Sequence, residues 1–503
     1  MPEVPPSPHS LGRLVRSFEH HERRGSRAPG NLHVAVVSRA GLGYEGTGAQ
    51  PTMTLDEIQE LQRYIAQCDP EQALVQENDP RYEPLDQGEP VRGSGGRSCI
   101  EELAQTIFLR EPTGATCQLF TGFSGSGKTT ELRRLKTRLE ADRVTPTHVI
   151  YINFEEFLDL YTPISITDIL RILAFALDRE ATAEKAIKEG KDPSKLEIGY
   201  LRRFYDFVAR LDPQIKSIGF DAYGAKLMLE IKDNPNFRER VEGALKLRFQ
   251  AFAEEATNIM TEAIVRLRTA THAQRVVVIA DGLEKLTYIH EKDRANVEGA
   301  AETLFVTHAS WLRLPVHVIY TFPFWLRFSA PTLGALYHCE PRILPMVKIA
   351  DKSGAPHADG IDKLARLVGR RVPLERVFGP APEQTLHPIL AASGGYPRDV
   401  LRLIRDLLSS TPSLPTTAAG CSRIIDQLGQ VYARVIRTPD LDLLAEVART
   451  HRLPRGDGAR IAAFSRLFGR QLVLTYLNGE EWYDLHPLVR RAPEVQERLA
   501  AAP

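Results

Sequence analysis

The chain has 503 residues, 43% of them hydrophobic and 25% charged, which predicts about two to four globular domains. Its 64 basic and 64 acidic residues cancel, which excludes a global field that attracts nucleic acid and leaves only local basic patches. Five singly placed cysteines and the lack of an apolar run of about 18 residues argue against a disulfide scaffold and a transmembrane helix, and predict a cytoplasmic protein without a membrane partner.

Residues 1–52 mix Pro, Gly, Arg and His without hydrophobic periodicity, as disordered segments do. Met53 is followed at once by Thr54, a suitable helix N-cap, and Glu57 stands three residues further on, as in a capping box. We interpret residues 1–52 either as a disordered tail or as a wrongly assigned extension of a chain that starts at Met53. Residues 53–95 are predicted to form a helical lead-in.

Residues 96–350 carry the pattern of a P-loop ATPase core. The predicted helices cover residues 96–110, 128–139 and 167–177, and the predicted strands cover residues 118–121, 148–153, 275–280 and 316–320. This β–α alternation predicts an α/β fold with a parallel sheet. Residues 180–272 are predicted to be a helical insertion in that core, with a hairpin near residues 215–231 and one long helix over residues 236–269.

The strongest motif is the run Gly122-Phe123-Ser124-Gly125-Ser126-Gly127-Lys128-Thr129, between a predicted strand and a predicted helix. Its glycines leave backbone N–H groups free to surround a triphosphate, and the helix that follows adds its N-terminal dipole. Lys128 is expected to neutralise the β- and γ-phosphates, and Thr129 to place its hydroxyl on Mg²⁺. An ordinary Gly/Ser loop is the alternative, and the flanking strand and helix disfavour it.

A second acidic motif follows a buried strand. Asp281 ends the apolar run that starts at Val276, at the sheet edge where open α/β sheets bind ligands, and is predicted to hold Mg²⁺. Glu284 is predicted to orient or deprotonate the attacking water, the alternative being a solvated acid at a helix start. Gly282 stands where fast ATPases usually carry the catalytic glutamate, so slow turnover is expected. Thr321, at the end of the fourth strand, is the candidate γ-phosphate sensor.

The remaining residues are predicted to form two helical units. Residues 355–436 are predicted to be an α-helical lid, in which Arg398 contacts the nucleotide or merely pairs with Asp399 or a neighbouring residue. Residues 439–491 contain two short helices and a hairpin at Asn478-Gly479, which indicates a small winged-helix domain. Weaker candidates for an arginine finger that acts on a neighbouring subunit are Arg327, Arg370 and Arg371.

Four of these segments resemble the AAA+/STAND group of P-loop ATPases, particularly the bacterial members. Phe120 to Leu132 is similar to their extended phosphate-loop signature, and Asp281-Gly282-Leu283-Glu284 to the STAND magnesium motif. Arg398 in Gly394-Gly395-Tyr396-Pro397-Arg398 resembles the lid arginine called sensor 2, and Leu485 to Val489 resembles the end of the winged helix. STAND proteins normally carry sensor repeats, and no repeat period is visible here, so the expected partner is a second copy of the chain or a separate sensor or effector protein.

The residues expected to form the site fall into three groups. The catalytic candidates are Lys128, Asp281 and Glu284, and the metal ligands are Thr129 and Asp281. The candidates for binding ATP are Gly122, Ser124, Gly125, Ser126, Gly127, Lys128, Thr129, Thr130, Thr321 and Arg398. ATP and Mg²⁺ are therefore the predicted cofactors.

The leading functional hypothesis is a regulatory ATPase that acts as a nucleotide-dependent switch. The alternative is an ATPase that handles duplex DNA through its winged helix. A basic side of that module favours the alternative, and it consists of Arg452, Arg455, Arg460, Arg466 and Arg470. Acidic residues on the wing oppose it, namely Glu480, Glu481 and Asp484. A small-molecule or nucleic-acid kinase and a non-hydrolysing nucleotide-binding scaffold are weaker alternatives.

Overall fold

The structure is a computed structural model. It describes residues 53–501 apart from 75, 77, 87–90, 95–96, 193–198, 213–229, 289 and 454–457. The predicted tail or extension at residues 1–52 and most of the hairpin predicted near residues 215–231 lie outside the described residues. Among the described helices, none combines the length and the apolar character that a bilayer crossing requires.

The core is an α/β unit built on a five-stranded parallel sheet with the strand order β4-β5-β6-β3-β7. The strands are β3 (Cys117–Gly122), β4 (Thr147–Asn153), β5 (Arg275–Asp281), β6 (His317–Thr321) and β7 (Arg342–Leu344). The four predicted strands are confirmed, whereas β7 was not predicted. Every residue of β5 is buried, as expected for a parallel strand that is covered on both faces.

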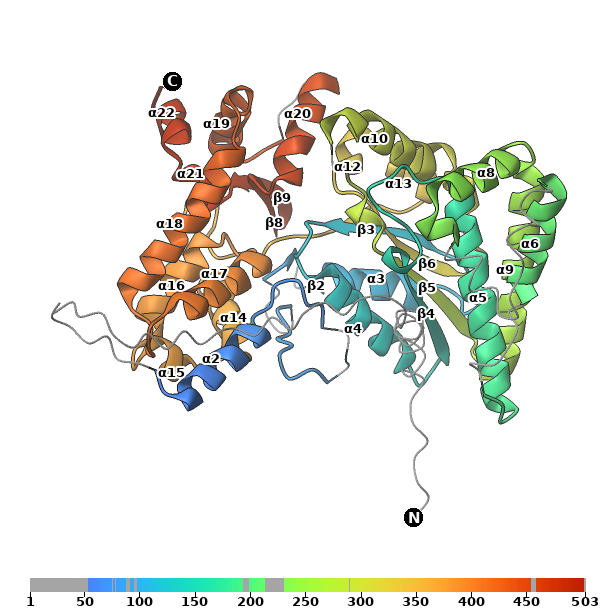
Figure 1. The fold of residues 1–503 in the computed structure, drawn as a ribbon, viewed down its shortest axis with the longest axis horizontal. Coiled ribbons are helices and arrows are strands. Elements are labelled where there is room, and N and C mark those ends of the chain that lie inside the picture. The colour runs from blue at the N-terminus through green and yellow to red at the C-terminus, as the bar shows by residue number, and fades with distance from the viewer. Residues whose placement is uncertain are drawn as a thin grey trace, which may run out of the picture.

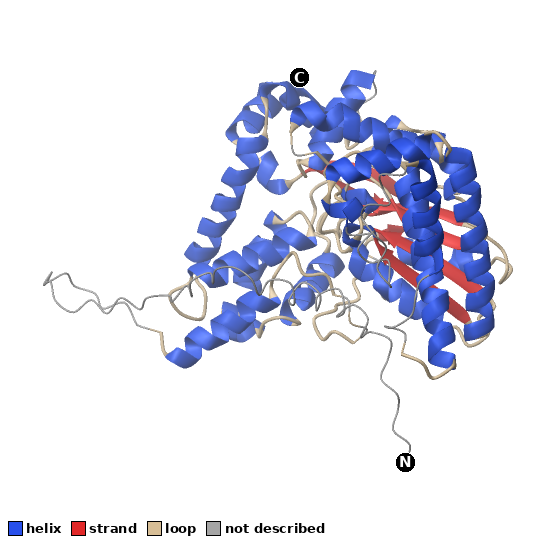
Figure 2. Ribbon diagram, turned by 45° about the vertical axis from the view of Figure 1, so that its right-hand side comes forward, coloured by secondary structure: helices blue, strands red, loops and turns tan. Residues whose placement is uncertain are grey.

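Successive side chains of the strands point to opposite faces, and each face has its own apolar core. Val277 and Ile279 pack with α3 (Cys99–Phe108) and α4 (Lys128–Glu140). Val276 and Val278 pack on the other face with α5 (Ile166–Lys188) and α9 (Phe249–Thr271). Figure 2 shows the sheet between these layers of helices. This arrangement leaves the carboxyl edge of the strands free for side chains that do chemistry.

The insertion consists of packed helices. In chain order, α6 (Gly199–Leu211) and α8 (Pro235–Lys246) follow α5 and precede α9. The single long helix predicted over residues 236–269 is wrong, because the chain leaves helical geometry at Arg248, where φ is −133° and ψ is 32°. No glycine or proline marks this break in the sequence. Tertiary contacts decide it, since Arg238 of α8 pairs with the buried Asp168 of α5 at 3.0 Å while α9 packs along the sheet.

Two further units complete the chain. The helical module (residues 358–435) consists of α14 (Ala358–Gly369), α15 (Leu374–Phe378), α16 (Pro382–Ala392), α17 (Pro397–Ser410) and α18 (Ala418–Val435). The C-terminal module (residues 438–501) consists of η8 (Thr438–Asp440), α19 (Leu441–Thr450), α20 (Gly458–Gly469), β8 (Val473–Asn478), β9 (Glu480–Leu485), α21 (Pro487–Arg490) and α22 (Pro493–Ala501). β8 and β9 pair antiparallel, as the Asn478-Gly479 turn predicts. Both modules share one apolar core, and Figure 1 shows them next to each other on one side of the molecule.

The lead-in begins with α2 (Leu55–Gln67), whose first turn has the predicted capping box between Thr54 and Glu57. This helix packs on α17 of the helical module, so the start of the described chain lies beside a unit that is distant in sequence. The remaining short elements are β1 (Gly93–Ser94), β2 (Arg97–Ser98), η2 (Phe154–Glu156), η5 (Leu283–Lys285), η6 (Glu291–Asp293), α10 (Arg294–Glu302), η7 (Thr303–Thr307), α11 (Ala309–Leu312), α12 (Leu326–Ser329) and α13 (Leu333–Tyr337).

Candidate nucleotide site

The phosphate loop (residues 122–129) connects β3 to α4, as predicted. Gly125 has φ +79° and Gly127, the N-cap of α4, has φ +97°, and both values are costly for residues with a Cβ atom. A Cβ atom on Gly125 would lie 2.5 Å from Arg398 Nε, so glycine is also required for space. In the part of the chain that the structure describes, the buried Ser126 Oγ has no hydrogen-bond partner, as fits a group available to a phosphate oxygen.

Lys128 lies inside this loop, with a side chain that is 3% exposed. Its ammonium group donates to the carbonyl oxygens of Gly122 at 2.9 Å and Phe123 at 2.8 Å. Its Nζ also lies 3.4 Å from Glu284 Oε1. Burial lowers the pKa of Lys128, and Glu284 opposes that effect only in part. The Lys128 side chain is therefore held at the loop by two carbonyl oxygens and faces the Glu284 carboxylate.

The predicted metal ligands meet at the carboxyl edge of the sheet. Thr129 Oγ1 donates to Asp281 Oδ2 at 2.8 Å, and the hydroxyl of Tyr151 donates to the same oxygen. Burial and the neighbouring Glu284 raise the pKa of Asp281 above its ordinary value. Hydroxyl and carboxylate oxygens are ligands that Mg²⁺ prefers, so the donor set fits that ion. Sequence reasoning missed Tyr151, and its position two residues before the end of β4 is the only signal that the sequence holds.

Glu284 is buried, which rules out a solvated acid at a helix start. Its Oε2 accepts a hydrogen bond from the Gly282 N–H at 3.1 Å, and its side chain is 3% exposed. Burial acts to raise the pKa of Glu284, but Lys128 and Thr321 outweigh it and hold that pKa below the usual value. Thr321 Oγ1 also accepts from the Leu283 N–H at 3.1 Å. The structure therefore brings together an ionised carboxylate, a lysine and a threonine hydroxyl at one edge.

The helical module reaches the phosphate loop through two side chains. Arg398 Nη1 donates to Ser124 Oγ at 3.2 Å, and the hydroxyl of Tyr396 donates to the Ser124 carbonyl oxygen. Arg398 Nη2 pairs with Glu71 Oε2 at 2.7 Å. The alternative pairing with Asp399 is not formed, because Asp399 Oδ2 accepts from Tyr432 and lies 3.1 Å from His486 Nε2. No sequence signal identified Glu71, which lies 327 residues before Arg398.

The strap (residues 71–92) links the phosphate loop to the helical module. Leu74 N–H donates to Thr130 Oγ1 at 3.2 Å, which places the Thr130 hydroxyl toward the strap. The buried Arg92 donates to the carbonyl oxygen of Ser126 at 3.3 Å and pairs with Glu131 at 2.7 Å. On the other side, Glu83 pairs with Arg366 at 3.1 Å. The strap therefore holds α4 and α14 at once.

The weaker arginine-finger candidates have partners within the chain. Arg370 pairs with Glu83 at 3.0 Å, and Arg371 donates to the carbonyl oxygen of Arg81 at 2.8 Å. Arg327 forms a two-oxygen contact with Glu481 of β9 at 2.5 and 2.6 Å. All three are therefore paired within the described chain, although the Arg370 side chain stays 49% exposed, and a role of these arginines toward a neighbouring subunit stays a prediction.

The C-terminal module packs directly on the phosphate loop. The ring of Phe123 lies 4.9 Å from that of Phe324, which follows β6, and 5.6 Å from that of Phe468 on α20. Phe468 also stacks on Phe328 of α12 at 5.1 Å. Sequence reasoning missed this aromatic cluster (Phe123, Phe324, Phe328, Phe464 and Phe468), because its members come from three separate segments. The loop, the core and the C-terminal module therefore form one packed unit.

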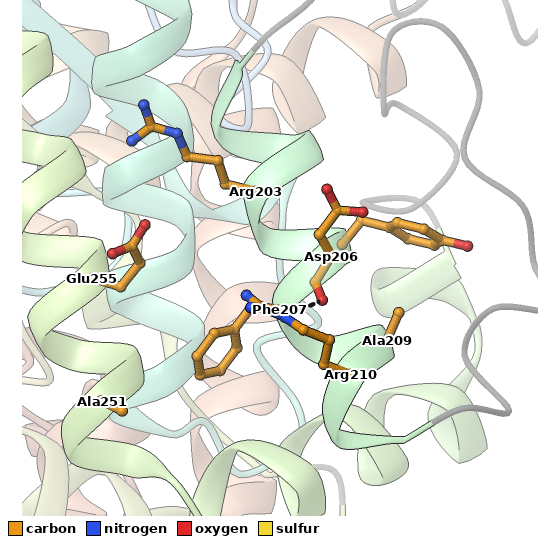
Figure 3. A pocket seen from close by; sticks show the side chains of 8 residues that line it. Arg203, Asp206, Phe207, Ala209, Arg210, Ala251 and Glu255 are labelled. Carbon is orange, nitrogen blue, oxygen red and sulfur yellow. Dashed lines mark hydrogen bonds between the residues drawn. The ribbon is translucent and has the colours of Figure 1, made fainter.

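Two other features of the described chain lie elsewhere. A hollow of about 800 Å³ opens between α6 and α9 of the insertion (Figure 3), where it is lined by Arg203, Tyr205, Asp206, Phe207, Ala209, Arg210, Ala251 and Glu255. His148, Glu180 and Glu184 bring their ligand atoms within 4.8 Å of one another at the amino end of β4. Neither group includes a residue of the phosphate loop.

No family model and no curated protein matches this sequence. Among solved structures, the Walker-type ATPase PABY2304 of Pyrococcus abyssi is 14% identical, with a TM-score of 0.35 over 80% of this chain and 94% of that chain. The ORC2 protein of Aeropyrum pernix in its ADPNP-ADP complexes is 12% identical, with a TM-score of 0.35 over 84% and 99%. Drosophila ORC bound to DNA is 14% identical, with a TM-score of 0.33 over 98% and 100%.

Similarities at this level assign neither a family nor a function to this chain. The classification therefore rests on its own geometry: a parallel sheet, a glycine-rich loop between β3 and α4, and an acid at the end of β5. These features define an α/β protein with the P-loop nucleotide-binding fold.

Proposed function

We propose that this protein is an ATP-binding, slowly hydrolysing regulatory ATPase of the AAA+/STAND type that acts as a nucleotide-dependent switch. The observation that carries the proposal is that two separate modules contact the same loop: Phe468 of the C-terminal module packs on Phe123, and Arg398 of the helical module binds Ser124. A phosphate group in that loop changes the interactions of both contacts, so nucleotide binding biases the position of both modules. The helical module is then the lid, and the C-terminal module the winged helix.

The chain's own residues have distinct roles in this proposal. Lys128 exchanges its carbonyl partners for the β- and γ-phosphates, and Arg398 exchanges Glu71 for phosphate. Thr129 and Asp281 hold Mg²⁺, which when bound neutralises charge that develops on the phosphate oxygens. Glu284, ionised in the folded protein, accepts the proton of the attacking water. Turnover is slow because the same carboxylate also faces the Lys128 ammonium.

DNA handling is the second candidate, and the placement of α20 bears on it. In a winged helix-turn-helix protein the helix before the hairpin reads the major groove. Residues Arg460 to Phe468 of α20 are buried or half-buried, with 41% of the Arg460 side chain exposed, and α20 contacts α12 of the core. Arg460 pairs with Glu446, and Arg455 lies outside the described residues. DNA reading by this helix therefore requires release of the module, so the switch is the primary proposal.

Nucleotide binding and steady-state hydrolysis by the full chain test the proposal, with and without duplex DNA. Lys128→Ala is expected to abolish ATP binding, and Glu284→Gln to keep binding and lose turnover, whereas the exposed Glu302→Gln serves as the matched control. A switch gives tight binding with slow turnover that DNA leaves unchanged. Turnover that DNA stimulates, and that both site variants lose, would establish the DNA-handling ATPase instead. Equal ATP affinity for Lys128→Ala and wild type would refute both.

A further inference from the structure

Two carbonyl oxygens of the phosphate loop are held from outside the loop by buried side chains. The carbonyl of Ser124 accepts the hydroxyl of Tyr396 from the helical module. The carbonyl of Ser126 accepts the guanidinium of Arg92 from the strap at 3.3 Å. Tyr396 and Arg92 are each 1% exposed. The two donors thus come from separate segments and reach alternate peptide groups of one loop.

Because a peptide group is planar, a hydrogen bond to its carbonyl oxygen also fixes the direction of its N–H. In a trans peptide the carbonyl of one residue and the N–H of the next point in opposite directions. The Tyr396 contact therefore fixes the N–H of Gly125, and the Arg92 contact fixes the N–H of Gly127. Both glycines lie at positive φ, where no side chain restricts the backbone. Phosphate recognition requires that such N–H groups converge on one point, so external support for these two peptides is functionally significant.

Each donor is itself fixed by its surroundings. Arg92 Nη2 pairs with Glu131 at 2.7 Å and Asp86 at 2.9 Å, so three acceptors orient one guanidinium. Tyr396 immediately precedes α17, and its N–H donates to the Ser393 carbonyl at 3.1 Å. Pre-ordered supporting groups of this kind hold a binding site near its productive geometry.

We propose that Tyr396 and Arg92 are positioning residues that aim the Gly125 and Gly127 N–H groups at the β-phosphate of a nucleoside di- or triphosphate. This inference rests on the proposed function, because it assigns the phosphate loop a nucleotide. It also gives the helical module a way to regulate phosphate affinity through one hydroxyl group. Movement of α17 withdraws the Tyr396 hydroxyl and releases the Gly125 peptide group.

Tyr396→Phe removes only that hydroxyl, and Tyr337→Phe is the matched control. Tyr337 is also buried and also donates to a backbone carbonyl, that of Phe305, away from the phosphate loop. The affinities of AMP, ADP and ATP are measured by titration calorimetry for the full chain. Loss of one such hydrogen bond predicts about 5- to 20-fold weaker binding of ADP and ATP by Tyr396→Phe. AMP, which has no β-phosphate, is expected to bind as it does to wild type, and Tyr337→Phe is expected to bind all three normally.

Arg92→Lys provides the second variant, since it keeps the positive charge beside Glu131 and Asp86 but loses the planar fork. Arg92→Lys is expected to bind ADP more weakly than wild type and to bind AMP normally, as Tyr396→Phe does. Unchanged ADP affinity in Tyr396→Phe, or an equal loss for AMP and ADP, would overturn the positioning role. ADP affinity in wild type that Lys128→Ala does not reduce would instead overturn the proposed function, so the two failures are distinguishable.

Discussion

Phe324 and Phe468 offer a direct test of whether the C-terminal module lies on the phosphate loop in solution. Their rings are 4.7 Å apart at an interplanar angle of 61°, an edge-to-face contact between the core and the module. Such aromatic pairs contribute about 0.5–1.5 kcal/mol beyond their buried area. Phe324→Leu and Phe468→Leu are each expected to cost about 1 kcal/mol of unfolding free energy, since each keeps most of the apolar volume. The double variant is expected to cost about 1 kcal/mol less than the sum of the two.

Urea unfolding followed by tryptophan fluorescence measures this cycle, because Trp325 lies beside Phe324 in the core and Trp482 lies in the C-terminal module. Phe157 and Phe175 form the positive control, as both belong to the core, with rings 5.8 Å apart in an edge-to-face contact. That pair is expected to show coupling whatever the module does. If the control pair couples while Phe324 and Phe468 add within about 0.3 kcal/mol, the docked arrangement, and the switch built on it, would be refuted.

Three further predictions concern the site and the core. Gly125→Ala places a Cβ atom at φ +79° and against Arg398, so ATP affinity in a fluorescence titration is expected to fall about tenfold. The control is Gly243→Ala in the open middle of α8, which is expected to leave ATP affinity unchanged and to raise the melting temperature. Burial and Glu284 raise the pKa of Asp281, so the gain in ATP affinity on adding Mg²⁺ is expected to decline on acidification at a higher pH than an ordinary aspartate gives. Asp281→Asn should show no such gain at any pH. A pH-independent gain in wild type would contradict the assignment. Burial and Arg275 lower the pKa of His317 from 6.5 to about 4. The neutral imidazole therefore stabilises the fold above pH 6.5, and the free energy of unfolding in urea is expected to fall by about 2–3 kcal/mol as the pH falls toward 4. An unchanged dependence of stability on pH in His317→Gln would contradict this.

The sequence predicts those parts of the fold that depend on local pattern. The run from Val276 to Ala280 is apolar throughout because β5 is covered on both faces, and the meeting of Thr129 with Asp281 follows from strands that end at one edge. β7 has only three residues, too few for a periodic signal. The break at Arg248 carries no glycine or proline, so only tertiary packing determines it.

The partners of the site residues depend on contacts between distant segments. Arg398 was recognised from its motif, but Glu71 is one exposed acid among many in the sequence, and nothing in the neighbouring residues indicates the pairing. Phe468 carries the same difficulty, since a phenylalanine at helical spacing predicts burial without identifying Phe123 as the neighbour. Functional side chains are therefore predictable from motifs, whereas the groups that support them are set by the assembled fold.

The strap also constrains the order in which the protein is completed during synthesis. Glu83 pairs with Arg366, which is synthesised 283 residues later. The Leu85 carbonyl likewise accepts a hydrogen bond from Lys363, which is also synthesised late. At about 5–20 residues per second, a ribosome needs about 15–60 s to cover that distance. The core strands and α4 leave the ribosome during this interval, while the strap still lacks its contacts with α14. A segment synthesised early thus gains its last contacts late, and a nascent chain that ends before α14 lacks the Tyr396 and Arg398 contacts to the phosphate loop.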